Sequence, residues 1–179
     1  YVQLFVFMLF NLVACAYVGG RSLVNRYALA LMICYIMGVM GYLFVPAYGP
    51  FVYEPSVFEH GWSNGPWQVA DIQRFILQRT LEVGRCTQPK IAPFAFVAAM
   101  PSLHVAVPAL GVVMLWGVWR PWLLMWVPLL LTVFASVATG MHYGVDLLAG
   151  VWVAIVSGWF AWKLQPRDDQ RRSQCKAAL

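Results

Sequence analysis

Five apolar segments, each close to the length that crosses a membrane, constrain this chain most: 1–18, 26–46, 101–118, 121–140 and 146–164. A membrane-spanning helix needs about 20 mainly apolar residues. Only 11% of the 179 residues are charged and 61% are hydrophobic, whereas soluble domains carry about 25% charged residues. Backbone polar groups inside a bilayer must be satisfied within the segment, which favours helices. The sequence therefore predicts an all-α, polytopic transmembrane helical bundle.

Positively charged residues indicate the orientation of these segments. They follow the first segment, separate the third from the fourth and recur after the fifth: Arg21, Arg26, Arg120, Lys163, Arg167, Arg171, Arg172 and Lys176. Because positive loops stay in the cytoplasm, we expect an extracytoplasmic loop at 47–100. We treat 1–164 as one membrane-embedded domain and 165–179 as a cytoplasmic basic tail. The basic residues are scattered, so we expect membrane lipids as partners and no nucleic acid.

The 47–100 loop is predicted to contain a helix of its own. Asn64 precedes Gly65-Pro66, a sequence typical of a helix start. One face of this helix would be mainly apolar and the opposite face charged. The residues that recur at helical spacing on the mainly apolar face are Ile72, Phe75, Ile76, Thr80 and Val83. This pattern predicts an amphipathic helix on the outer membrane surface, acting either as a lid or as a packed surface helix.

Two histidines and one aspartate stand at the predicted outer ends of apolar segments, where ionisable groups are candidates for function. His104 begins the third segment, and His142 and Asp146 begin the fifth. The 38 residues between the histidines fit one helix down and one back, each covering about 27 Å at 1.5 Å per residue. Both histidines should therefore lie at the same depth.

These three residue types suit phosphoryl transfer. His142 and Asp146 are four residues apart, so on a helix they share a face. The carboxylate can then fix the tautomer of His142 and leave its other nitrogen as a nucleophile, while His104 serves as general acid and base. Such a route through a phosphohistidine requires no metal and no cofactor.

Ser102 lies beside His104 in the sequence Pro101-Ser102-Leu103-His104. It can bind phosphate at the positively polarised helix end, or it can simply cap the helix. His60, beside Glu59, has no comparable neighbours. Two other functions stay open: a haem-binding membrane protein with His104 and His142 as axial ligands, and a non-catalytic membrane scaffold.

At these residues the chain resembles the type-2 phosphatidic acid phosphatase (PAP2) superfamily of membrane lipid phosphatases and phosphotransferases. The Pro-Ser-x-His signature matches 101–104, and the His-x-x-x-Asp signature matches His142 and Asp146. The resemblance covers 26–164. It implies that His142 is the nucleophile, that Asp146 orients it and that His104 is the general acid and base.

Two cations of that superfamily's signatures are missing. No Lys is followed seven residues later by Arg-Pro, and Ser136 occupies the place of an arginine six residues before the nucleophile. Since the resemblance implies that these cations hold phosphate, other donors must replace them. The candidates are basic residues of the outer loop: Arg74, Arg79, Arg85 and Lys90.

Three further motifs, 46–50, 100–106 and 138–143, resemble the inositol-phosphotransferase-like branch, which includes inositol phosphorylceramide synthases. That branch commonly has six helices, so we expect a sixth helix in the full protein. The resemblance implies a lipid phosphatase or a head-group phosphotransferase, with a slight preference for transfer. We expect it in a bacterial inner membrane or an endomembrane, with its active site on the extracytoplasmic face.

Overall fold

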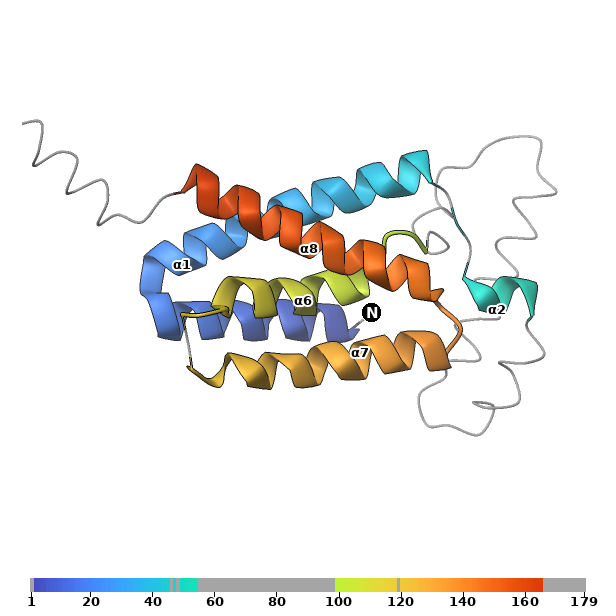
Figure 1. The fold of residues 1–179 in the computed structure, drawn as a ribbon, viewed down its shortest axis with the longest axis horizontal. Helices are drawn as coiled ribbons and strands as arrows, with labels where there is room; N and C mark the ends of the chain where they lie inside the picture. The colour runs from blue at the N-terminus through green and yellow to red at the C-terminus, as the bar shows by residue number, and fades with distance from the viewer. Residues whose placement is uncertain (1, 46, 48, 55–98, 119, 166–179) are drawn as a thin grey trace, which may run out of the picture.

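The computed structural model describes residues 2–45, 47, 49–54, 99–118 and 120–165. Its elements are α1 (Val2–Phe44), α2 (Pro50–Tyr53), α6 (Leu103–Leu115), the 3₁₀ helix η1 (Arg120–Met125), α7 (Trp126–Ala138) and α8 (Gly144–Leu164). These ranges contain no strand (Figure 1), so the all-α prediction is confirmed. The predicted loop helix and the four loop cations, Arg74, Arg79, Arg85 and Lys90, lie outside the described residues, as does 166–179 of the tail.

The element α1 contains two helical arms that meet at Gly20. Gly20 has φ 55° and ψ −152°, which is not helical, and glycine adopts a positive φ without the cost of a Cβ. In Figure 1 the first arm runs away from the N-terminus and the second arm runs back past it towards α2. The first two apolar segments of the sequence therefore form the two arms.

Helix α6 is the centre of the bundle. It packs against α1, α7, α8 and η1, and eleven of its thirteen residues are buried. A helix that is apolar all round is one that other helices enclose. Its first turn, which carries His104, is therefore held by neighbours on several sides.

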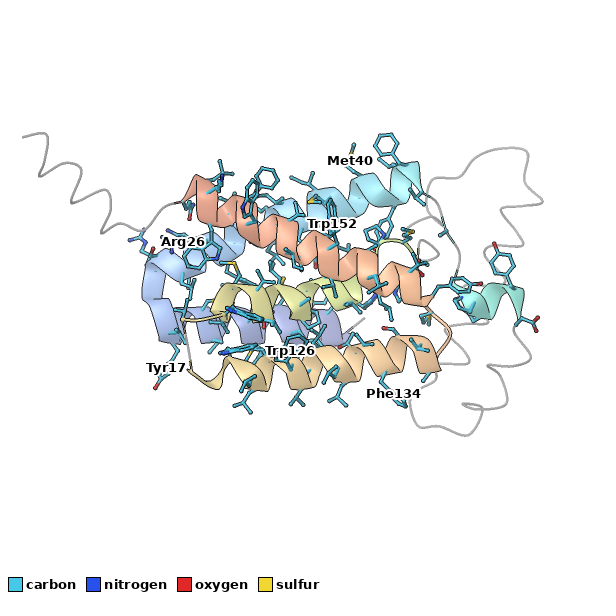
Figure 2. The ribbon with its side chains drawn as sticks, viewed as in Figure 1. Tyr17, Arg26, Met40, Trp126, Phe134 and Trp152 are labelled. Carbon is cyan, nitrogen blue, oxygen red and sulfur yellow. The ribbon has the colours of Figure 1, made fainter. Side chains whose placement is uncertain are left out.

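Small residues let α8 approach α6 closely. The buried face of α8 includes Gly150, Ala154 and Gly158, and small residues at a spacing of four are typical of helix contacts in membranes. Large apolar side chains instead cover the outside, as Phe134 and Met40 illustrate in Figure 2. Exposed apolar side chains of this kind are typical of helices that contact lipid.

Two described helices are long and apolar enough to cross a membrane, Leu4–Phe44 and Gly144–Leu164, and two shorter apolar helices are Leu103–Leu115 and Trp122–Ala138. Their length and composition are consistent with a membrane protein. Five spans, or six in the full protein, stay a prediction.

The connection between α6 and α7 begins inside the apolar segment 101–118 and not after it. The chain already turns at 116–118, where Gly117 has φ 68°, and Arg120 begins the 3₁₀ helix η1. Helix α6 consequently has 13 residues, about 20 Å at 1.5 Å per residue. The first of the two helices between the histidines is therefore shorter than the length of about 27 Å that the sequence predicts.

Arg26 closes the end of the bundle where α8 finishes. Its Nε donates a hydrogen bond of 2.6 Å to the carbonyl oxygen of Gln165, and its guanidinium lies 4.4 Å from the ring centroid of Trp162. A cation at a helix C-terminus satisfies the last carbonyls and the helix dipole. Figure 2 shows Arg26 at the left end, remote from α2.

A buried amide ties the first arm of α1 to α6. Asn11 Nδ2 donates a hydrogen bond of 3.0 Å to the carbonyl oxygen of Val107, and Gly111 leaves the space that the Asn11 amide occupies. We expect Asn11→Ala to lower the free energy of unfolding by about 1 kcal/mol, because the carbonyl loses a partner in an apolar interior. Unfolding in detergent micelles measures this, with the exposed Asn25→Ala as control. Equal stability of the two variants would show that the hydrogen bond from Asn11 to Val107 does not stabilise the fold.

Candidate active site

The two predicted histidines lie together at the end of the bundle opposite Arg26. His104 is in the first turn of α6, and His142 lies in the loop between α7 and α8. Their ring centroids are 5.8 Å apart and the ring planes are inclined by 53°. His142 is buried and His104 is half-buried. Residues that are 38 positions apart in the sequence therefore converge, as the helix lengths predicted.

Asp146 is buried beside His142 but does not hydrogen-bond to it. Asp146 Oδ2 lies 3.8 Å from His142 Nδ1, which is too long for a hydrogen bond. The same oxygen accepts the backbone N–H of Tyr143 at 2.8 Å. Helix α8 begins only at Gly144, so the prediction that His142 and Asp146 share a helix face is wrong. The carboxylate instead caps the start of α8, as acidic residues at this position commonly do.

Ser102 occupies the N-cap position of α6, yet its side chain does not cap the helix. The residue is fully buried, and its Oγ has no hydrogen-bond partner among the described residues. His142 Nδ1 is in the same condition. A buried polar atom without a partner costs about 1–3 kcal/mol, so two of them in one place require an explanation, such as a ligand.

Backbone hydrogen bonds hold the loop that carries His142. The N–H groups of Met141 and His142 both point to the carbonyl oxygen of Ser136, at 3.2 and 3.3 Å. Phe51 N–H donates to the carbonyl oxygen of Gly140 at 3.0 Å. The loop is thus fixed from α7 on one side and from α2 on the other.

The sequence did not reveal the part that the segment before α2 plays here. Gly49 lies so close to the carbonyl oxygen of Met141 that a Cβ at Gly49 would overlap it. Ala47 accepts the N–H of Ala99, at 2.8 Å, just before α6. The sequence motif 46–50 covers this segment, but a motif does not show what the segment contacts.

The described cations lie away from this site. Arg21, Arg26, Arg120 and Lys163 belong to segments at the other end of the bundle (Figure 1). Among the described residues, no group of three or more His, Cys, Asp and Glu side chains could hold a metal ion.

Burial is the main influence on the ionisation of His142, which lies outside the spanning helices. It lowers the pKa of His142 below its ordinary value, while the Asp146 carboxylate and the backbone of Ala99 oppose the shift. Removal from water disfavours the charged imidazolium. His142 is therefore neutral at pH 7 and carries a lone pair.

At one end of an apolar helical bundle, the buried His142 and the half-buried His104 lie beside a buried carboxylate. The sequence model of the PAP2 superfamily matches residues 1–160. The chain therefore belongs to the PAP2 superfamily. Searches among curated proteins and among solved structures each found no match. Membership indicates phosphatase or phosphotransferase activity and does not favour haem binding.

The balance between burial and Asp146 gives a testable pKa. We expect Asp146→Asn to lower the pKa of His142 further, because the variant removes the charge that stabilises the imidazolium; an amide oxygen can still accept the Tyr143 N–H. NMR titration of histidine-labelled protein in detergent measures this, with His60→Gln to simplify assignment. The exposed carboxylate of Glu54 at the same end of the bundle provides the control, Glu54→Gln. An unchanged or raised pKa in Asp146→Asn would contradict this account.

Proposed function

We propose that this protein cleaves a lipid phosphoester through a phosphohistidine intermediate. The observation that supports this most is the convergence of His104 and His142, whose ring centroids are 5.8 Å apart. Asp146 is buried nearby, and the Ser102 hydroxyl has no partner in the part of the chain that the structure describes. This reaction requires at least a nucleophile, a general acid, a charged group that stabilises the nucleophile and a hydrogen-bond donor that binds phosphate. Membership in the PAP2 superfamily points to the same chemistry.

In the first step a nitrogen of His142 attacks phosphorus. The P–N bond forms, the bond from phosphorus to the lipid oxygen breaks, and His104, which binds a proton in the complex with the anionic phosphate, gives that proton to the departing oxygen. Asp146 stabilises the positive charge that develops on His142, because its carboxylate oxygen lies 3.8 Å from His142 Nδ1.

In the second step the acceptor attacks the phosphohistidine. His104 takes a proton from the acceptor hydroxyl, the new P–O bond forms and the P–N bond breaks, which restores both histidines. Water as acceptor makes the protein a phosphatase, and a lipid or polyol hydroxyl makes it a head-group transferase. The motifs shared with the inositol-phosphotransferase-like branch, 46–50 and 100–106 among them, support a slight preference for transfer.

Two groups of donors hold the phosphate in this proposal. The buried Ser102 hydroxyl faces no other partner among the described residues, so it is available to a phosphate oxygen. The positive charge that phosphate requires comes from the outer loop, with Arg74, Arg79, Arg85 and Lys90 as candidates. Charge-assisted hydrogen bonds from such groups are the strongest that phosphate makes in proteins.

The active site faces the extracytoplasmic side in this proposal. Arg26 lies at the opposite end of the bundle, where α8 finishes with Lys163 in its last turn. Positive residues concentrate on the cytoplasmic side, which leaves the histidines outside. A cysteine placed at residue 104 should therefore react with a membrane-impermeant reagent in sealed cells.

Lipid phosphate cleavage by His142 is the central prediction. Purified protein, without added metal, should release phosphate from a lipid phosphate or transfer it to a lipid alcohol, and His142→Ala should lose at least about 10³-fold in rate, since it lacks the nucleophile. Paired donor and acceptor lipids test transfer in the same assay. His60→Ala, which removes the third histidine, should keep wild-type rates.

The covalent intermediate offers a second measurement on the same samples. Brief reaction with a ³²P-labelled lipid phosphate should leave acid-labile, base-stable label on the wild type and on His60→Ala, and none on His142→Ala. Full activity of His142→Ala with both donor and acceptor lipids would remove the proposal.

Replacing the loop cations should weaken substrate binding. We expect Arg74→Gln, Arg79→Gln, Arg85→Gln or Lys90→Gln to raise the KM for a lipid phosphate about tenfold for the residue that contacts phosphate, as the loss of a charged hydrogen bond implies. Arg171→Gln in the tail is the matched control. Wild-type KM values in all four loop variants would show that none of these loop cations binds the substrate phosphate.

A further inference from the structure

The backbone of Ser102, the N-cap residue of α6, contacts the backbone of α8 at two residues. Ser102 N–H donates a hydrogen bond of 3.0 Å to the carbonyl oxygen of Asp146. The carbonyl oxygen of Ser102 lies so close to the backbone of Gly150 that a Cβ on Gly150 would overlap it. Since Asp146 and Gly150 are one helical turn apart, we refer to Ser102, Asp146 and Gly150 as the helix clasp.

The helix clasp joins the two halves of the histidine site. His104 follows Ser102 by two residues on the α6 side, and Asp146 on the α8 side lies 3.8 Å from His142. Any displacement of Ser102 relative to α8 therefore changes the position of one histidine ring relative to the other. The backbone of Ser102 cannot yield easily, because its carbonyl oxygen also accepts the N–H of Ala106 at 3.0 Å within α6.

We propose that Gly150 is a positioning residue for the reaction: by carrying no side chain, it sets the distance between His104 and the His142–Asp146 pair. The consequence for catalysis rests on the proposed function, whereas the consequence for ring geometry does not. The atoms nearest to a Cβ at Gly150 belong to Ser102 and Ala106 and not to a histidine. Gly150 therefore acts through Ser102, whose carbonyl oxygen it faces.

Gly158 provides a matched control on the same face of α8. It lies two turns after Gly150, and a Cβ there would be 2.6 Å from Cγ1 of Val113 on α6. Gly158→Ala and Gly150→Ala thus add the same methyl group between the same two helices. The new methyl group of Gly150→Ala meets the backbone of Ser102, two residues from His104. The new methyl group of Gly158→Ala meets a side chain, that of Val113.

Kinetics of the full chain in detergent separate the two variants. Both should lower the melting temperature, because both crowd a close helix contact. Gly150→Ala alone should lower kcat, by about 10²-fold for a displacement near 1 Å, with KM for the lipid phosphate nearly unchanged. Equal kcat in the two variants would overturn the proposal.

The ring contact is read without activity. In protein labelled at histidine, cross-relaxation between the ring protons of His104 and His142 should be present in the wild type and in Gly158→Ala, and severalfold weaker in Gly150→Ala. An unchanged contact in Gly150→Ala would overturn the proposal. If the wild type proves inactive on every lipid phosphate tested, the proposed function fails, and this comparison still decides the role of Gly150.

A second variant covers the case in which Gly150→Ala does not fold. Gly41 lies against the ring of Pro101, the residue before Ser102, so Gly41→Ala displaces the same segment from α1. We expect a lower kcat, an unchanged KM and a weaker ring contact. Wild-type values for all three would show that the site does not depend on the position of Ser102.

Discussion

The structure depends on the close approach of α6 to α8. In lipid, the hydrophobic effect does not drive helices together, because the surrounding chains are as apolar as leucine, and association relies on packing and on polar contacts between helices. Gly150, Ala154 and Gly158 supply the packing surface. Ser102 supplies the polar contact, through its hydrogen bond to the Asp146 carbonyl. Without both, the first turns of α6 and α8 would have no fixed relation, and the histidines would have none either.

Asp146 shows how one buried carboxylate serves structure and chemistry together. Its Oδ2 accepts the Tyr143 N–H and so begins α8, and the positive end of the helix dipole favours the charged carboxylate there. The same oxygen lies 3.8 Å from His142 Nδ1. The carboxylate is thereby kept near the histidine without a direct hydrogen bond.

Counting residues predicted correctly that His104 and His142 meet, although the two legs between them are unequal: α6 ends at Leu115, and the return leg runs from Arg120 to Ala138. Individual boundaries were not predictable in this way. Helix α6 stops at Leu115 since Gly117 turns the chain with a positive φ, and α8 starts after His142 since Asp146 caps it. Each of these depends on a local backbone geometry that apolar periodicity does not report.

Contacts made by glycine could not be predicted for a different reason: what distinguishes Gly150 is its closeness to the carbonyl oxygen of Ser102, which is distant in the sequence. A pattern of residue types cannot show which backbone atom will approach a glycine.

The Ser102 hydroxyl and His142 Nδ1 give the site its chemical character. Both are buried without a partner among the described residues, whereas the buried amide of Asn11 is satisfied by Val107. Each unpartnered group lowers stability by about 1–3 kcal/mol. In the proposed reaction, a phosphate that accepts the Ser102 hydroxyl would recover part of that cost on binding. The fold therefore keeps, beside the contact between α6 and α8, polar atoms that the proposed substrate would satisfy.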